Sequence, residues 1–206
     1  REAVRKAPEV LLELIRQALE VGVEATHVLF DSWFAFPGTI QKICDRGLHV
    51  ICMLKALPTV KYDFNGQVLT LKQLYAAVRK RPGRARILAS LTVTLVNDAQ
   101  GLPVKAKIVF VRDRRNSGKW LALLSTDLTL SDEEVVRIYG KRWDIEVFFK
   151  MTKSYLNLAK EFQGRSYDMM VAHTSIVFMR YVMLAWLSRE EADPRTLGNL
   201  FYACCD

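Results

Sequence analysis

The stretch Tyr139-Gly-Lys-Arg142-Trp-Asp-Ile-Glu146, followed by Lys150 and Lys153, decides how the chain is interpreted. At about 100° per residue in an α-helix, one sector of about 60° holds Tyr139, Arg142, Glu146 and Lys153. Lys150 lies beside this stripe. One carboxylate among an aromatic ring and three cations suits a metal-binding acid whose neighbours hold phosphates. The alternative is an ordinary surface helix, in which an Arg–Glu pair four residues apart contributes roughly 0.2–0.5 kcal/mol.

The spacing Tyr-x2-Arg-x3-Glu-x6-Lys resembles the YREK signature of the DDE transposases of the insertion-sequence 4 group. The flanks are similar too: Trp143 follows the Arg, Ile145 precedes the Glu, and the run Leu-Leu-Ser-Thr-Asp127 leads in. The resemblance implies an α/β fold with an RNase H-like catalytic core interrupted by a β-rich insertion. It also implies cut-and-paste transposition, in which phosphodiester bonds at transposon ends are cleaved and the freed 3′-hydroxyl is joined to target DNA.

The same resemblance implies metal-binding carboxylates. In that family three carboxylates hold two Mg²⁺ ions, with Mn²⁺ as a substitute, and two metals can stabilise the attacking and leaving oxygens. Asp31 would be the second carboxylate and Glu146 the third. Asp31 follows an apolar strand, at the end where open α/β sheets place their sites; its alternative role is a turn residue before Ser32-Trp33. Residues 1–30 contain no Asp, so we expect the first one upstream and no DNA cleavage by this segment alone.

Apolar runs at residues 26–30 and 48–54, joined by a helix that begins at Pro37, predict a buried parallel sheet. A helix over residues 8–21 precedes them. Residues 86–96 alternate, and one face is expected to hold Ile87, Ala89, Leu91, Val93 and Leu95.

Turn and capping signals divide the rest of the chain. Asn65-Gly66 predicts a two-residue hairpin turn. Residues 104–111 and 119–124 predict further strands. A capping box at Ser131-Asp-Glu-Glu134 begins one helix that is expected to continue through Lys153, and a last helix covers roughly residues 167–189.

We therefore expect three parts. Residues 1–57 form the first part of an RNase H-like core, residues 58–127 a basic β-rich insertion, and residues 128–206 a C-terminal helical part. Residues 55–120 hold 14 Lys and Arg but three Asp, a local charge of +11, whereas the rest of the chain has a charge of −3. Such segregation indicates binding to a polyanion, here DNA.

Several side chains are candidate DNA contacts. By the resemblance, Arg142 and Lys153 would grip phosphates near a transposon end, Tyr139 would contact the same backbone, and Lys150 would add charge; Arg can form a forked contact that Lys cannot. Basic loops of the insertion add Arg79, Lys80, Arg81, Arg84 and Arg86.

Two tryptophans have a structural and a functional interpretation. Trp143 could stack on DNA, although packing beneath the helix is the favoured interpretation. Trp120 could stack on a flipped base, or lie in the core as most strand tryptophans do.

Other reactive residues indicate no further chemistry. Cys44 and Cys52 lie in apolar patterns typical of core thiols, which fits a reducing, prokaryotic cytoplasm near the nucleoid. His27, His49 and His173 are scattered. Asp127 is expected to shape the turn before Ser131, and Asp144 lies about 160° from Glu146 on the helix.

Two features bear on membranes and on completeness. Residues 169–187 are apolar but interrupted by His173 and Arg180, which favours a buried helix and no membrane partner. No signal peptide is visible. The chain begins with Arg and ends at Cys-Cys-Asp, so we expect a fragment.

Three functional hypotheses follow. The first is the catalytic-core portion of a cut-and-paste transposase, acting on paired transposon ends as a homodimer. The second is a non-catalytic DNA-binding remnant, with salt-sensitive binding through the insertion and no metal dependence. The third is a general RNase H-like nuclease without selectivity for an end sequence.

Overall fold

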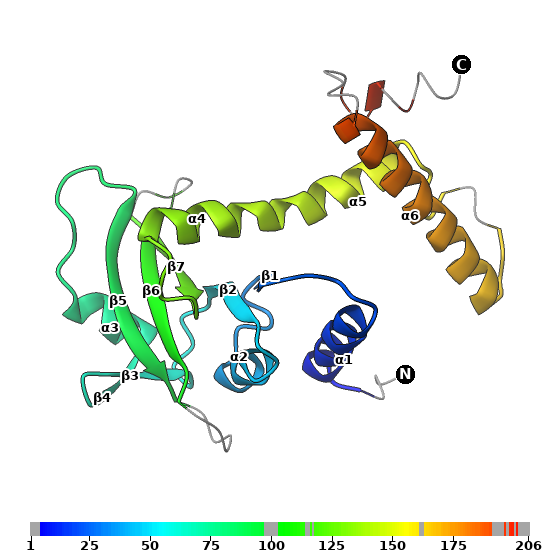
Figure 1. Ribbon diagram of the computed structural model, residues 1–206. Helices are drawn as coiled ribbons and strands as arrows, with labels where there is room; N and C mark the ends of the chain where they lie inside the picture. The colour runs from blue at the N-terminus through cyan, green and yellow to red at the C-terminus, as the bar shows by residue number, and fades with distance from the viewer. Residues whose placement is uncertain are drawn as a thin grey trace. The chain divides into compact units, whose positions relative to one another are not determined.

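The structure, a computed structural model, describes residues 5–96, 103–113, 116, 118–160, 163–190, 196, 198–199 and 201. Two compact units divide the chain, Arg1–Lys141 and Arg142–Asp206, and each is described by itself. Figure 1 labels the elements, which are α1 (Ala7–Glu20), β1 (His27–Phe30), α2 (Pro37–Cys44), β2 (His49–Leu54), β3 (Lys61–Phe64), β4 (Gln67–Thr70), α3 (Leu71–Ala77), β5 (Ile87–Leu95), β6 (Lys105–Arg112), β7 (Trp120–Ser125), α4 (Asp132–Gly140), the 3₁₀-helix η1 (Lys141–Trp143), α5 (Asp144–Ser154) and α6 (Tyr167–Glu190).

One mixed sheet organises the first unit. Within the described residues it has seven strands in the order β1-β2-β7-β6-β5-β3-β4. β1 and β2 are parallel, with His27 opposite His49, because α2 carries the chain back to the start of the next strand. Every other neighbouring pair is antiparallel. The expected parallel sheet is therefore confined to β1 and β2.

Helices cover both faces of this sheet. On one face, α2 packs on β2 and buries Ile40 and Ile43, α3 packs on β3 and β4 and buries Leu74, and α1 adds Leu12. On the other face, α4 buries Val135 and Val136 against the strands. The unit is thus a three-layer α/β arrangement, with apolar stripes on the helices meeting both faces of the pleat.

β5 departs from strict alternation at its first residue. Ala89, Leu91, Val93 and Leu95 pack on the α2/α3 face as expected, but Ile87 packs on the α4 face. The register between β5 and β6 shifts between Ile87 and Ala89, and such a bulge turns the side chains before it to the opposite face. The prediction that all five share one face was wrong for Ile87.

The strands of residues 58–127 belong to the same sheet as β1 and β2. β7 pairs with β2 on one side and with β6 on the other, so hydrogen bonding is continuous from β1 to β4. The three-part division of the chain stays a prediction, and the structure itself separates the units after Lys141.

The helix expected from Ser131 through Lys153 is not a single α-helix. The capping box is present, because the Ser131 side chain accepts from the Glu134 amide, and α4 then ends at Gly140. Three residues of 3₁₀-helix follow before α5 begins at Asp144. Glycine disfavours a helix interior, and a 3₁₀-helix turns by about 120° per residue. The angles calculated at about 100° per residue therefore do not apply between Tyr139 and the residues that follow Gly140.

The second unit contains α5 and α6. Phe148 packs edge-on against Phe178 and Tyr181, at centroid distances of 4.9 and 4.7 Å. Within the described residues, α6 is the one helix long and apolar enough to cross a membrane by length and composition. It was expected to be buried, yet many of its apolar side chains are exposed, among them Met179, Val182 and Trp186.

Candidate functional site

Asp31 directly follows β1, at the carboxyl end of the parallel strand pair. Its side chain is in an exposed position, and its Oδ1 accepts a hydrogen bond from the Trp33 amide at 2.8 Å. That turn bond is the alternative role considered for this residue. Within the described part of the chain the second carboxylate oxygen accepts no hydrogen bond, so the turn leaves one oxygen available to a cation.

Glu146 stands in the first turn of α5 and pairs with Arg142 of the preceding 3₁₀-helix. Arg142 Nη1 lies 3.6 Å from Glu146 Oε1, and their side chains are 24% and 49% exposed. Lys150 is exposed one turn further along, and Lys153 Nζ lies 5.7 Å from the centroid of the Phe149 ring. The carboxylate is therefore held at the surface of the second unit among the cations expected around it.

Trp143 differs from its expected packing. Its side chain is 59% exposed at the end of the 3₁₀-helix. An exposed indole retains a free face, on which a planar group such as a base could stack.

Tyr139 lies in the first unit, where it packs against the cluster between α4 and the sheet. It also lines a cavity of about 450 Å³ together with Arg86, Arg112 and the apolar residues Met53 and Leu123. The structure thus brings Arg86, a cation of the β-rich segment, to the same cavity as Tyr139. The Arg112 guanidinium donates to the carbonyls of Ala85 and Gly83, at 3.2 and 3.1 Å, and Asp113 also lines the cavity.

Arg81, predicted as a DNA contact, is engaged within the protein. Its guanidinium lies 2.6 Å from Asp132 Oδ2 and 3.6 Å from Glu133 Oε1, both in the first turn of α4. Ser90 Oγ donates to the same Asp132 oxygen at 2.8 Å. This network ties the loop before β5 to the helix that leads to Tyr139.

The other cations of that segment divide into two kinds. Lys80 donates to the Ala76 carbonyl at 3.1 Å and lies 4.8 Å from the centroid of the Tyr75 ring. Arg79 and Arg84 are exposed and form no ion pair within the described residues. Arg79 and Arg84 are thus more available to an external anion than Lys80 or Arg81.

Trp120 packs in an aromatic cluster on the α2/α3 face. Its ring stacks on Tyr75 at a centroid distance of 4.8 Å and meets Phe110 edge-on at 5.1 Å. This is the core role considered for a strand tryptophan, and both ring contacts lie within the usual range for stabilising aromatic pairs.

Asp31, in the first unit, and Glu146, in the second, are the two carboxylates that were expected to bind a metal. Both supply hard carboxylate oxygens of the kind that Mg²⁺ prefers, so the two residues fit the ion in chemical type. No group of three His, Cys, Asp or Glu side chains within the described residues is arranged to hold a metal.

A polar cluster that was not predicted links β1, β2 and the turn after β7. His27 Nε2 lies 3.1 Å from Asp127 Oδ2, and the His27 and His49 rings are 5.3 Å apart. Asp127 also accepts from the Thr129 hydroxyl and amide, at 2.6 and 2.9 Å, which confirms its expected role in the turn. These Thr129 bonds, with a smaller contribution from His27, lower the pKa of Asp127. The sequence signal was that each histidine is the second residue of an apolar run that forms the parallel pair.

Comparison with known proteins identifies the family of this chain. Residues 3–183 match the family described as "Transposase DDE domain". A stretch of 81 residues is 31% identical to the protein described as "Probable transposase for insertion sequence element IS5377" from Geobacillus stearothermophilus. That stretch is 39% of this chain and 21% of the relative, so a small part of the relative's length is matched. Because the family match spans most of the chain, this protein belongs to the transposase DDE domain family.

Proposed function

We propose that this chain carries two of the catalytic carboxylates of a cut-and-paste DNA transposase, Asp31 and Glu146. The complete protein would cleave phosphodiester bonds at transposon ends and join the 3′-hydroxyl to target DNA. The observation that carries the proposal is that the family match includes both a carboxylate at the end of β1 and a carboxylate set among cations on α5.

The position of Asp31 in the sheet supports this proposal. Leu29, two residues earlier, packs in the cluster on the α4 face, as does Tyr139. Side chains alternate along an extended strand, so residue 31 is directed to that same face. The alternation therefore directs Asp31 and the signature tyrosine to one side of the sheet.

Each residue has a role that its chemistry permits. Asp31 and Glu146 would hold Mg²⁺, for which Mn²⁺ could substitute, and the bound metal would supply charge stabilisation for phosphoryl transfer. Arg142 holds Glu146 by their ion pair, and its positive charge would attract a phosphate. Lys150 and Lys153 add positive charge that positions the DNA backbone without reading its sequence.

The test compares two acidic residues of the same helical turn. In the complete protein, Glu146→Ala is expected to abolish Mg²⁺-dependent cleavage of end-containing DNA while largely sparing DNA binding. Asp144→Ala is the matched control, because both acids are exposed in the first turn of α5 but point to different faces. Normal cleavage by Glu146→Ala would refute the assignment, and so would equal loss in both variants.

The same proposal includes finer expectations. On the spacing from Tyr139 to Lys153, we expect membership of the insertion-sequence 4 group. We also expect action as a homodimer on paired ends in a prokaryotic cytoplasm. Selective cleavage at end sequences would separate this transposase from a general RNase H-like nuclease. Salt-sensitive DNA binding without metal-dependent cleavage by the complete protein would instead indicate a non-catalytic remnant.

A further inference from the structure

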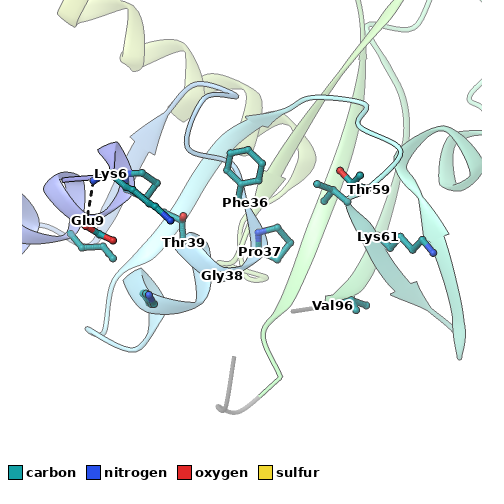
Figure 2. Close-up of a pocket in the computed structure, with 13 residues that line it drawn as sticks. Lys6, Glu9, Phe36, Pro37, Gly38, Thr39, Thr59, Lys61 and Val96 are labelled. Carbon is teal, nitrogen blue, oxygen red and sulfur yellow. Dashed lines mark hydrogen bonds between the residues drawn. The ribbon is translucent and has the colours of Figure 1, made fainter. Parts of the chain in front are cut away.

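A second cavity of the first unit lies on the α2/α3 face of the sheet, opposite to α4. Its volume is about 740 Å³. The first turns of α1 and α2 form one part of its wall, and residues 59–61 with Val96 form the rest. Figure 2 shows Lys6, Glu9 and Thr39 on one side of this cavity and Thr59, Lys61 and Val96 on the other. We call it the helix-end cavity.

Two helices direct their positive ends into the helix-end cavity. A helix N-terminus presents unpaired backbone N–H groups and roughly half a positive charge. At α1 this charge is already matched, because Glu9 accepts from the Lys6 amide at 3.3 Å. α2 has no acidic residue in its first turn and no side-chain cap. The dipole of α2 is therefore uncompensated where it faces the cavity.

The first turn of α2 also offers a free backbone donor. Thr39 and Ile40 donate to the Phe36 carbonyl at 2.9 and 3.0 Å, whereas the Gly38 amide has no partner within the described residues. A Cβ atom added to Gly38 would meet no atom within 4 Å. A ligand can therefore approach this donor closely.

A hydroxyl on a largely buried threonine points to a ligand independently of the helix ends. Thr39 lines the cavity with 7% of its surface exposed, and its hydroxyl has no hydrogen-bond partner within the described part of the chain. The hydroxyl is therefore open to the cavity and can donate to a ligand. An acceptor that enters the cavity would satisfy it.

The charges around the cavity define the ligand as an anion. Lys6 and Lys42 line it, and the Lys6 side chain runs toward Thr39 in Figure 2. The Lys61 side chain runs away from the cavity and contributes charge without contact. Glu9 is the acidic residue among the lining residues, and its carboxylate is bonded to α1.

From these features we infer that the helix-end cavity binds a phosphate of the DNA backbone, on the face of the sheet opposite to α4. The Gly38 amide and Thr39 hydroxyl donate to the phosphate oxygens, while Lys6 and Lys42 supply charge. The inference rests on the proposed function for the identity of the polyanion, and the chain charge of +8 agrees with it. This contact would fix the position of DNA on the protein without reading bases.

The first experiment tests the site with inorganic phosphate. Adding millimolar phosphate to the isotope-labelled 206-residue chain is expected to shift the NMR amide signals of Gly38 and Thr39, and Thr39→Val is expected to weaken that binding several-fold. Unchanged Gly38 and Thr39 signals would overturn the site. Phosphate could shift these signals although a DNA duplex neither causes the same shifts nor displaces the phosphate. That result would show that the ligand is free phosphate and would overturn the DNA assignment.

The second experiment measures DNA affinity across salt concentrations without divalent metal. Losing one phosphate contact lowers the slope of log affinity against log salt by about 0.9, roughly a tenfold loss at 0.1 M salt. Thr39→Val/Lys42→Gln is expected to show this loss. Thr92→Val/Lys72→Gln is the control, because its exposed residues on β5 and α3 lie outside the cavity.

The outcomes separate this inference from the proposed function. Equal slopes for the two double variants would refute the helix-end cavity as a DNA site. Normal DNA binding combined with full cleavage by Glu146→Ala would refute the catalytic proposal. The inference about the cavity would then still be judged by the salt dependence of DNA affinity in the two double variants. A chain that binds no DNA at low salt would contradict both.

Discussion

Replacing Arg81 by Gln tests whether this residue stabilises the fold or binds DNA. In the structure its guanidinium lies 2.6 Å from Asp132 Oδ2, and the same oxygen accepts from Ser90 at 2.8 Å. Gln keeps a long polar side chain but removes the positive charge. The change therefore isolates the ion pair between the loop before β5 and the first turn of α4.

The size of the effect follows from the exposure of the two side chains. Arg81 is 46% exposed, whereas Asp132 is 11% exposed. A hydrogen bond to a charged group contributes about 1.5–3 kcal/mol, and a fully exposed ion pair about 0–1 kcal/mol. With one partner half in solvent, we expect a coupling free energy of about 1 kcal/mol. Asp132→Asn should cost more, about 2 kcal/mol, because it also weakens the Ser90 bond and the favourable charge at the helix N-terminus.

The assay is a double-mutant cycle on Arg81→Gln and Asp132→Asn, with the free energy of unfolding measured in urea at low and high salt. The coupling should fall as salt screens the exposed guanidinium. The slope of DNA affinity against salt should stay unchanged in Arg81→Gln. Arg79→Gln is the control, because Arg79 is exposed without an ion pair in the described residues and should have little effect on stability. Coupling below about 0.3 kcal/mol together with a lowered DNA slope would refute the structural role of Arg81.

Three further predictions concern stability. Thr39→Val should change the free energy of unfolding in urea by less than about 0.5 kcal/mol, because its hydroxyl faces a cavity and has no hydrogen-bond partner in the described residues; a larger loss of stability would show that the hydroxyl is satisfied within the fold. Because the pKa of Asp127 is lowered in the fold, the ionised carboxylate should stabilise the protein at pH values above the ordinary carboxyl pKa of 3.8. This stabilisation should be lost as the pH falls toward the lowered pKa. Urea titrations of Asp127→Asn against pH should lack this component, and an identical acid dependence would contradict it. Gly140→Ala meets no atom within 4 Å and should raise the melting temperature through a gain of about 0.4–1 kcal/mol; a lower melting temperature would show that α4 must end there.

Local rules predicted several elements correctly. Asn65 and Gly66 have φ angles of 54° and 82°, as the two-residue hairpin turn between β3 and β4 requires. Ser131 caps α4, and Pro37 begins α2. Each of these features depends on contacts within about four residues, which a sequence pattern contains directly.

The same local rules failed where two preferences competed. The helical spacing from Tyr139 to Lys153 favoured one long helix, but Gly140 disfavours a helix interior and a turn of 3₁₀-helix follows it. The alternation of β5 favoured one face for Ile87, but a register shift against β6 reversed it. A periodic pattern does not contain the register of the neighbouring strand, so the departure of Ile87 was not visible from its own segment.

The sequence by itself determined the chemistry available: an acidic residue after the first strand, an acid among cations at fixed helical spacing, and a strongly basic middle segment. The tertiary structure determines which side chains from distant parts of the sequence lie together. It placed His27 beside Asp127, Arg81 beside Asp132 and Arg86 in one cavity with Tyr139. It also brought the first turns of α1 and α2 to a common cavity. The reason is that strand order follows from packing summed over the whole sheet, whereas spacing along the chain records neighbours a few residues apart.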